Sequence, residues 1–125
     1  MEDLSGDRIL VVDDDDNIRQ IVQLCLSDEG YRVRDAPNGE AALEMLGNFD
    51  PELILLDLRM PVMNGWEFAR RYRTRPGPHA PIVAFVAALN AKEECAGLET
   101  VAILSKPFDL DDLLAAVRAQ LPLVR

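Results

Sequence analysis

The sequence is poor in the residues that build metal knuckles, disulfide frameworks and imidazole chemistry. Its 125 residues include two cysteines, Cys25 and Cys95, which stand far apart, and one histidine, His79. Isolated cysteines form neither a zinc motif nor a disulfide framework. His79 follows Pro76-Gly77-Pro78, a loop composition that indicates a solvated side chain. The chemistry of this chain therefore has to come from other side chains.

Long apolar runs and an excess of positive charge are also absent. No apolar run reaches the roughly 18 residues that span a bilayer, and residues 1–7 are acidic and lack the apolar region of a signal peptide. We therefore expect a cytoplasmic protein without membrane insertion. The formal net charge of −9 disfavours direct contact with nucleic acid, because phosphates would be repelled. This charge suits a basic partner or a site that collects cations.

The apolar content is sufficient for one buried core. Apolar residues make up 49% of the chain, and 125 residues is an ordinary size for a single domain. The sequence shows no linker, no repeat and no change of composition along its length. We expect one domain over residues 1–125, with a core from about residue 8 to residue 121.

Short apolar segments alternate with segments of helical periodicity. The segments predicted to be strands are 8–12, 31–35, 53–56, 81–86 and 101–104. Helices are predicted between them and after the last one, with the segment from 90 to about 98 only weakly helical. This alternation predicts an α/β fold in which helices flank both faces of a doubly wound parallel sheet of five strands.

Helix start and stop signals support this order. Side chains that suit a helix N-cap precede three of the helices: Asp15 or Asp16, Asn38, and Asp109 with Asp112 three residues later. Gly30 is predicted to end the first helix. The apolar face of that helix is predicted to consist of Ile18, Ile21, Val22 and Cys25. The last helix should bury Leu110, Leu113, Leu114, Val117 and Leu121.

Three of the predicted strands lead into charged residues. Residues 53–56 run into Asp57, residues 9–12 run into Asp13 and Asp14, and Lys106 follows residues 101–104 by two positions. An apolar run without alternation is typical of a central strand buried on both faces. Open α/β sheets bind ligands beyond the carboxyl ends of their strands. If these strands are neighbours, the carboxylates converge at one edge with the ammonium of Lys106 beside them.

Each of these features also has a simpler interpretation. Asp57 can merely mark the end of a strand. The residues from Asp13 to Asp16 can cap a helix, although capping accounts for one or two aspartates and not for four. Lys106 can be an ordinary surface lysine. Only the combination favours a site.

Three carboxylates in contact call for a cation. They raise one another's pKa unless a positive charge intervenes. Mg2+ is suitable, because it takes one or two carboxylates, keeps several waters and is completed by a phosphate oxygen. A carboxylate can also attack phosphorus and form an acyl phosphate, and phosphoryl transfer mainly needs positioning and charge neutralisation. The metal and Lys106 would supply both.

The sequence resembles the receiver domain of two-component response regulators. The resemblance covers residues 8 to about 121, and its matching segments are Ile9-Leu10-Val11-Val12-Asp13-Asp14-Asp15, Leu55-Leu56-Asp57-Leu58-Arg59-Met60-Pro61 with Asn64-Gly65, and Ser105-Lys106-Pro107-Phe108. These segments occur in the family's order and on the expected strands. The resemblance implies a flavodoxin-like fold with strand order 2-1-3-4-5.

The resemblance also implies a role for each site residue. Asp57 would be the phosphoacceptor, taking its phosphoryl group from a phosphohistidine on a sensor histidine kinase or a histidine phosphotransfer protein. Asp14 and Asp57 would bind Mg2+ directly, the backbone carbonyl of Arg59 would add a ligand, and Asp13 would act mainly through water. Lys106 would contact the phosphoryl group, and its bond to the following proline would be cis.

Two positions depart from the family pattern. In the family, strand 4 usually ends in Thr or Ser, whose hydroxyl bonds a phosphoryl oxygen, and strand 5 often carries Tyr or Phe three residues before the lysine. Here these positions hold Val86 and Ile103. Both are also ordinary strand residues. The segment 86–106 is slightly short for the family as well. The phosphoacceptor and metal residues are intact, whereas the residues that transmit the signal are changed.

Two functions of different class follow. The first is a stand-alone receiver that accepts a phosphoryl group on Asp57 in a Mg2+-dependent phosphorelay and signals by docking a downstream protein on the face of its last helix. Its conformational output would be atypical, and it would be a phosphoacceptor and not an enzyme. The second is a pseudo-receiver, an interaction domain that works independently of phosphorylation. The intact acid residues favour the first, whereas Val86 and Ile103 favour the second.

A third function, a Mg2+-dependent phosphatase of the haloacid dehalogenase type, is disfavoured. Such enzymes carry an Asp-x-Asp pattern around the nucleophile. In this sequence Asp57 is followed by Leu58 and Arg59.

Overall fold

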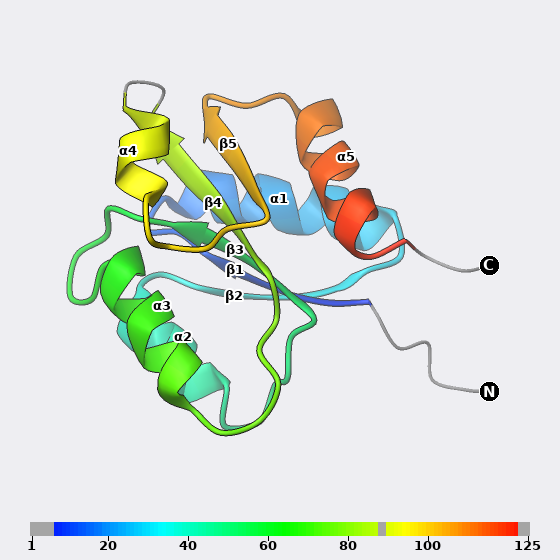
Figure 1. Cartoon of the computed structure of the whole chain (residues 1–125). Helices are drawn as coiled ribbons and strands as arrows, with labels where there is room; N and C mark the ends of the chain where they lie inside the picture. Colours follow the sequence, from blue (N-terminus) through cyan, green and yellow to red (C-terminus); the bar gives the residue numbers. More distant parts are fainter. Residues whose placement is uncertain (1–6, 88–89, 123–125) are drawn as a thin grey trace.

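Five parallel strands form one sheet, as the sequence predicts. The computed structural model describes residues 7–87 and 90–122, and within them the strand order is β2-β1-β3-β4-β5 (Figure 1). The strands are β1 Arg8–Val12, β2 Arg32–Ala36, β3 Leu53–Asp57, β4 Ile82–Ala87 and β5 Ala102–Lys106. All neighbouring pairs are parallel. The predicted order 2-1-3-4-5 is therefore confirmed, and β2 lies at an edge as expected.

Helices alternate with the strands along the chain. They are α1 Asp16–Asp28, α2 Gly39–Met45, α3 Gly65–Thr74, α4 Ala91–Cys95 and α5 Leu110–Gln120. Helices α1 and α5 lie together on one face of the sheet, and α2 and α3 lie together on the other (Figure 1). Helix α4 lies beside β4, on the side of α3. Among the described residues no helix is both long enough and apolar enough to cross a bilayer.

The sheet separates two apolar clusters, because successive strand residues point to opposite faces. Ile9, Leu53 and Leu55 pack with the α1–α5 layer, whereas Leu10, Ile54 and Leu56 pack with α2 and α3. All five residues of β3 are buried, including its final carboxylate. Strand β3 is packed on both faces, and this packing sets the position of Asp57 at its carboxyl end.

Local capping holds the helices close to their predicted starts. The Asp15 side chain accepts hydrogen bonds from the backbone N–H groups of Asn17 and Ile18, and Asn38 accepts one from Ala41. Asp109 occupies the N-cap position of α5 but its side chain makes no capping hydrogen bond, so the predicted pairing with Asp112 does not form.

Several predicted details differ from the structure. On α1 the buried residues are Val22 and Leu26, whereas Ile21 is 50% exposed, because the helix presents a face rotated toward Leu26. On α5, Leu110 is also exposed. Strand β5 continues through Lys106, because its backbone keeps pairing with β4 beyond the apolar run. Strands β2 and β4 are each shifted one residue along the chain from the prediction, and α4 has only five residues.

One buried hydrogen bond joins the two ends of the fold. The hydroxyl of Tyr31, just before β2, donates to the backbone carbonyl of Leu121, just after α5, at 2.6 Å. Tyr31 and Leu121 are both buried. The end of α5 is therefore anchored to the start of β2.

Candidate functional site

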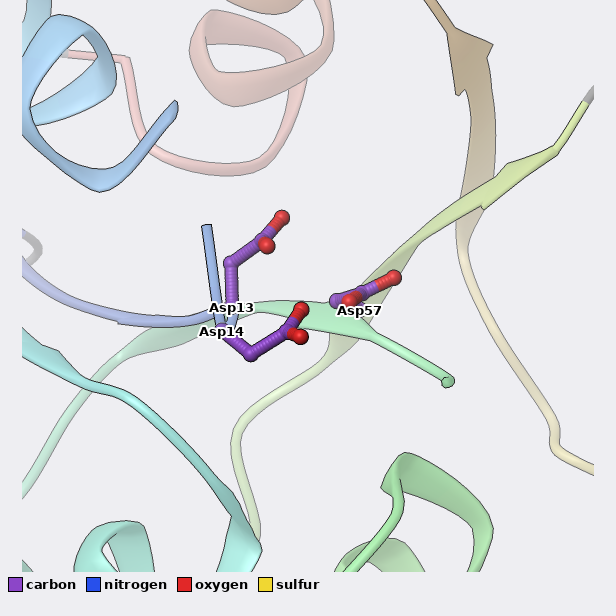
Figure 2. A group of neighbouring side chains, drawn as sticks. All are labelled: Asp13, Asp14 and Asp57. Carbon is purple, nitrogen blue, oxygen red and sulfur yellow. The ribbon is translucent and has the colours of Figure 1, made fainter. Parts of the chain in front are cut away.

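Two neighbouring strands bring three carboxylates together. Val12 of β1 pairs with Leu56 of β3, so Asp13 and Asp57 come next on adjacent strands. Asp13, Asp14 and Asp57 each offer an oxygen, and these oxygens lie within 4.8 Å of one another. Figure 2 shows the three side chains gathered at this end of the sheet. The predicted convergence of the acidic residues is found.

Asp13 is the most tightly held of the three. It is fully buried, and its Oδ1 accepts a hydrogen bond from the backbone N–H of Asp15 at 2.9 Å. Its backbone carbonyl accepts one from Arg19 Nη1 at 2.7 Å. Its Oδ2 lies 2.8 Å from Lys106 Nζ. The sequence predicts Lys106 beside the carboxylates, but not that its direct partner at 2.8 Å is Asp13, because β1 and β5 are not neighbouring strands.

Asp57 is almost as buried, with 6% of its surface exposed. Burial, and then the neighbouring charge of Asp13, raise the pKa of Asp57 from 3.8 to about 6, although Lys106 acts in the opposite direction. Lys106 Nζ lies 3.4 Å from Asp57 Oδ1. The carboxylate is therefore an anion that the site holds at some cost, which a further positive charge would relieve.

Lys106 connects both buried acids. Burial alone would lower the pKa of its ammonium, but the hydrogen bond and charge of Asp13, together with the charge of Asp57, raise the pKa above its usual value. Lys106 thus stays protonated and is directed into the pocket. Its bond to Pro107 is cis, as the resemblance implied.

The donor set fits a hard divalent cation. Oxygen ligands from two or three carboxylates are what Mg2+ takes in proteins. Asp13 Oδ2 lies 2.8 Å from Lys106 Nζ and has no other hydrogen-bond partner among the described residues, so it retains a lone pair for a further partner. Asp14 is exposed and opens the group to solvent. These three residues could hold Mg2+, whereas the carbonyl ligand from Arg59 stays a prediction.

The loop after β3 packs closely against the backbone of Asp57. Gly65, the first residue of α3, donates its backbone N–H to the carbonyl of Leu58 at 2.9 Å. A Cβ at Gly65 would lie only 2.5 Å from the backbone oxygen of Asp57. Val62 in the same loop has φ of 70°, a left-handed value that is strained for a β-branched residue. The backbone around Asp57 therefore has little freedom to move.

The acidic group opens into a pocket of about 460 Å³. Its wall includes Asp57, Arg59, Val86, Glu94 and Lys106. Val86 is buried and contributes no hydrogen-bond donor where the family places a hydroxyl. Ile103 does not line this pocket and is 36% exposed on β5. Of the two departing positions, only Val86 borders the acidic group.

A second charged pair at the pocket was not predicted. Arg59 donates to Glu94 of α4, with Nη2 and Oε2 2.6 Å apart, and its guanidinium lies 5.3 Å from the ring centroid of Trp66. Glu94 also accepts, at its backbone carbonyl, a hydrogen bond from Trp66 Nε1 at 2.8 Å. The sequence signal was weak, because Glu94 lies in a segment with little helical pattern, 35 positions from Arg59.

The family is shown by the sequence as a whole. The sequence model of the response regulator receiver domain matches residues 9–118. The chain therefore belongs to the response regulator receiver domain family, and its fold and acidic group agree with that assignment.

Two curated relatives support the same family assignment. The chain is 41% identical over 116 residues to the response regulator MprA of Mycobacterium sp. (strain KMS) and 42% identical to that of Mycobacterium ulcerans (strain Agy99). Each match covers 91% of this chain and 50% of the relative, so the chain spans about half the length of the curated relatives it matches.

Solved structures give the same result. The chemotaxis response regulator CheY4 of Vibrio cholerae has a TM-score of 0.84 and 32% identity, with 94% of this chain and 100% of that chain covered. The response regulator TrrA of Thermotoga maritima, solved in complex with Mg2+ and BeF, has a TM-score of 0.79 and 33% identity, with 91% and 98% covered.

Proposed function

We propose that this receiver domain accepts a phosphoryl group on Asp57 from the phosphohistidine of a sensor histidine kinase or a histidine phosphotransfer protein. The observation that carries the proposal is the meeting of three carboxylates with Lys106, which lies 2.8 Å from Asp13 and 3.4 Å from Asp57. The domain is a phosphoacceptor that responds to its own modification, and it does not turn over an external substrate.

In the transfer step an oxygen of the Asp57 carboxylate attacks phosphorus. The new O–P bond forms as the P–N bond to the donor histidine breaks, and the imidazole nitrogen leaves with the bond's electron pair. The product is an acyl phosphate on Asp57. Lys106 orients the Asp57 carboxylate and meets the phosphoryl oxygens with a fixed positive charge. Asp13 in turn holds Lys106 in the pocket.

Bound Mg2+ would neutralise charge on the transferring phosphoryl group. Asp13, Asp14 and Asp57 would hold it, as the donor set allows. The relative TrrA, whose structure was solved in complex with Mg2+ and BeF, supports Mg2+ binding at these residues.

A hollow of about 500 Å³ beside the pocket would suit a protein partner. It is lined by apolar residues of α1 and of the segment after β5: Ile18, Ile21, Val22, Pro107, Phe108 and Leu110. Lys106 borders both this hollow and the acidic pocket. A partner seated here would stand next to Asp57. The net charge of −9 favours a protein partner over nucleic acid for this domain.

The test is intact-mass spectrometry after incubation with acetyl phosphate and Mg2+. We expect one phosphoryl adduct on the wild-type chain, removed by hydroxylamine and absent from Asp57→Asn. Asp109→Asn, which alters an exposed aspartate outside the site, is the matched control and should retain the adduct. An adduct that persists in Asp57→Asn would refute the assignment.

The metal role is tested separately. Asp14→Ala should lose Mg2+ binding and phosphorylation while keeping the fold, because Asp14 is exposed and its removal relieves crowded negative charge. Asp16→Ala, outside the acidic group, is the control. Unchanged Mg2+-dependent phosphorylation in Asp14→Ala would show that the metal lies elsewhere.

A second candidate, a pseudo-receiver that binds partners independently of phosphorylation, is favoured by Val86 in the pocket wall. Without a hydroxyl at this position the phosphoryl group has no differential contact with β4. NMR of free and beryllofluoride-loaded protein should show wild-type shifts around Asp57 that do not reach β5 and α5, and Val86→Thr should extend them toward Lys106 and α5. Wild-type shifts across β5 and α5 that Val86→Thr leaves unchanged would contradict this account.

A further inference from the structure

Arg59 joins helix α4 to the loop that follows β3. Arg59 follows the phosphoacceptor by two residues, and both its Nε and its Nη2 donate to Glu94 Oε2, at 3.2 and 2.6 Å. The same guanidinium lies over Trp66, whose indole N–H donates to the Glu94 carbonyl. Arg59, Trp66 and Glu94 form a closed set of contacts, which we name the α4 latch.

Helix α4 itself is short and weakly capped, although Arg73 also donates to the carbonyls of Leu98 and Glu99 just after it. Helix α4 has five residues, and its N-cap Asn90 makes no side-chain capping bond and has φ of 64°. Cys95 and Leu98 supply the buried apolar contacts of this segment. A helix this short has little intrinsic stability, so its position depends on tertiary contacts such as the latch.

Arg59 and Glu94 both line the pocket that contains Asp57. A phosphoryl group carries close to two negative charges and three strong acceptor oxygens. A guanidinium binds such an oxyanion in a forked geometry that a single carboxylate oxygen does not match. Glu94, in contrast, would be repelled by the added charge. The Glu94 carboxylate and the phosphoryl group therefore compete for the Arg59 guanidinium, and phosphorylation of Asp57 favours its contact with the phosphoryl group.

We propose that phosphorylation of Asp57 draws the Arg59 guanidinium away from Glu94 and Trp66 and so releases α4. This inference rests on the proposed function. A conformational response requires a contact that differs between the free and the phosphorylated domain. Arg59 provides such a contact, at a position other than Val86 and Ile103. The signal then leaves the pocket through the loop after β3 and α4, and not through β4 and β5.

The chain contains its own reporter, because Trp66 is its only tryptophan. Opening of the latch removes the indole hydrogen bond and the contact with the Arg59 guanidinium, so Trp66 becomes more exposed to water. Its emission should therefore shift to longer wavelength. The probe is beryllofluoride with Mg2+, and 19F NMR measures formation of the adduct independently of Trp66. The unloaded Glu94→Gln variant should already be shifted toward the loaded wild-type spectrum. Glu93→Gln, its exposed neighbour on α4, should match the wild type in both states.

The decisive comparison is Arg59→Gln at full 19F occupancy. We expect the Trp66 response to loading to be lost in this variant. If the wild-type adduct forms and the Trp66 emission does not change, or if Arg59→Gln responds as the wild type does, the inference is wrong while the proposed function stands. If no adduct forms on the wild type, the proposed function fails and the inference fails with it.

Discussion

Strands β3 and β5 each deliver one charged residue to the pocket, but the fold holds them in different ways. Both strands have five residues. Every residue of β3 is buried between β1 and β4 and between two helix layers, so Asp57 is positioned by packing. Strand β5 lies at the edge, and its alternate residues Ile103 and Ser105 are exposed.

Lys106 is therefore positioned by charge. Its neighbours along β5 are half-buried or exposed, whereas its ammonium meets the fully buried Asp13 at 2.8 Å. The Asp57 carboxylate is held in place by apolar burial, whereas the Lys106 ammonium is held by an ion pair. The two strands should therefore respond unequally to the same kinds of change.

The largest expected effect comes from shortening a side chain on each strand. Leu55→Ala empties a fully buried position on β3 and should lower the free energy of unfolding by about 2–5 kcal/mol. Ile103→Ala on β5 should cost about 1 kcal/mol or less, because the side chain is partly in water. Urea denaturation of both variants gives the comparison. Equal losses would show that β5 is packed as firmly as β3.

The next effect concerns the backbone at the end of β3. Gly65→Ala should destabilise the domain by about 1–3 kcal/mol, because the new Cβ would overlap the backbone oxygen of Asp57 and the Cα of Leu58. Gly47→Ala is the matched control, since its Cβ meets only the Glu44 carbonyl, at 3.3 Å. Thermal unfolding should rank Gly65→Ala well below Gly47→Ala. The reverse order would mean that the end of β3 can move.

The third prediction concerns the charge of the Asp57 carboxylate, whose burial at the end of β3 destabilises the folded state. The pKa of Asp57 rises from 3.8 to about 6 on folding, so this group stabilises the fold below pH 4 and loses that contribution as pH rises through 6. A shift of two pKa units corresponds to almost 3 kcal/mol, which solvent access reduces to about 1–2 kcal/mol. In metal-free buffer at neutral pH, Asp57→Asn should therefore be more stable than the wild type.

The pH profile of unfolding checks this prediction. The advantage of Asp57→Asn should shrink as pH falls from 6 to 4, and the exposed-site variant Asp109→Asn shows the effect of removing an aspartate charge elsewhere. A stability difference that does not vary with pH would mean that burial of the Asp57 carboxylate has no electrostatic cost.

The smallest effect is expected in the loop that leaves β3. Val62→Gly should stabilise the domain by about 0.5–1 kcal/mol, because glycine accepts a φ of 70° that strains valine, and the exposed side chain gives up little burial. Val101→Gly, at an exposed valine without positive φ, should instead destabilise it. Chemical denaturation distinguishes the two. A loss of stability in Val62→Gly would show that the loop tolerates valine without strain.

The strands and the acidic group could be predicted because their signals are local. Apolar runs that end in Asp13, Asp14 and Asp57 specify buried strands, and parallel pairing then brings their ends together. Asp15 and Asn38 cap their helices through contacts of two or three residues. These features depend on neighbours in sequence, or on a sheet rule that all such folds obey.

The remaining details depend on tertiary contacts that no local pattern contains. Ile21 and Leu26 both fit a helical face, and only the docking of α1 on the sheet decides that Leu26 is buried. The Asp13–Lys106 and Arg59–Glu94 pairs join residues 93 and 35 positions apart. The roles of Asp57, Lys106, Val86 and Ile103 in signalling stay predictions for the experiments above.

The hydrogen bond from Tyr31 to Leu121 also has a consequence for how the chain is made. The last helix completes, together with α1, the layer that covers Ile9, Leu53 and Leu55 on one face of the sheet, and Leu121 just after it accepts the bond from Tyr31. During synthesis on the ribosome, these residues emerge long before their partners on α5. Until residue 121 leaves the exit tunnel, α1 alone covers that face of the sheet and the Tyr31 hydroxyl lacks its carbonyl. The nascent domain therefore completes its folding only when its last helix emerges.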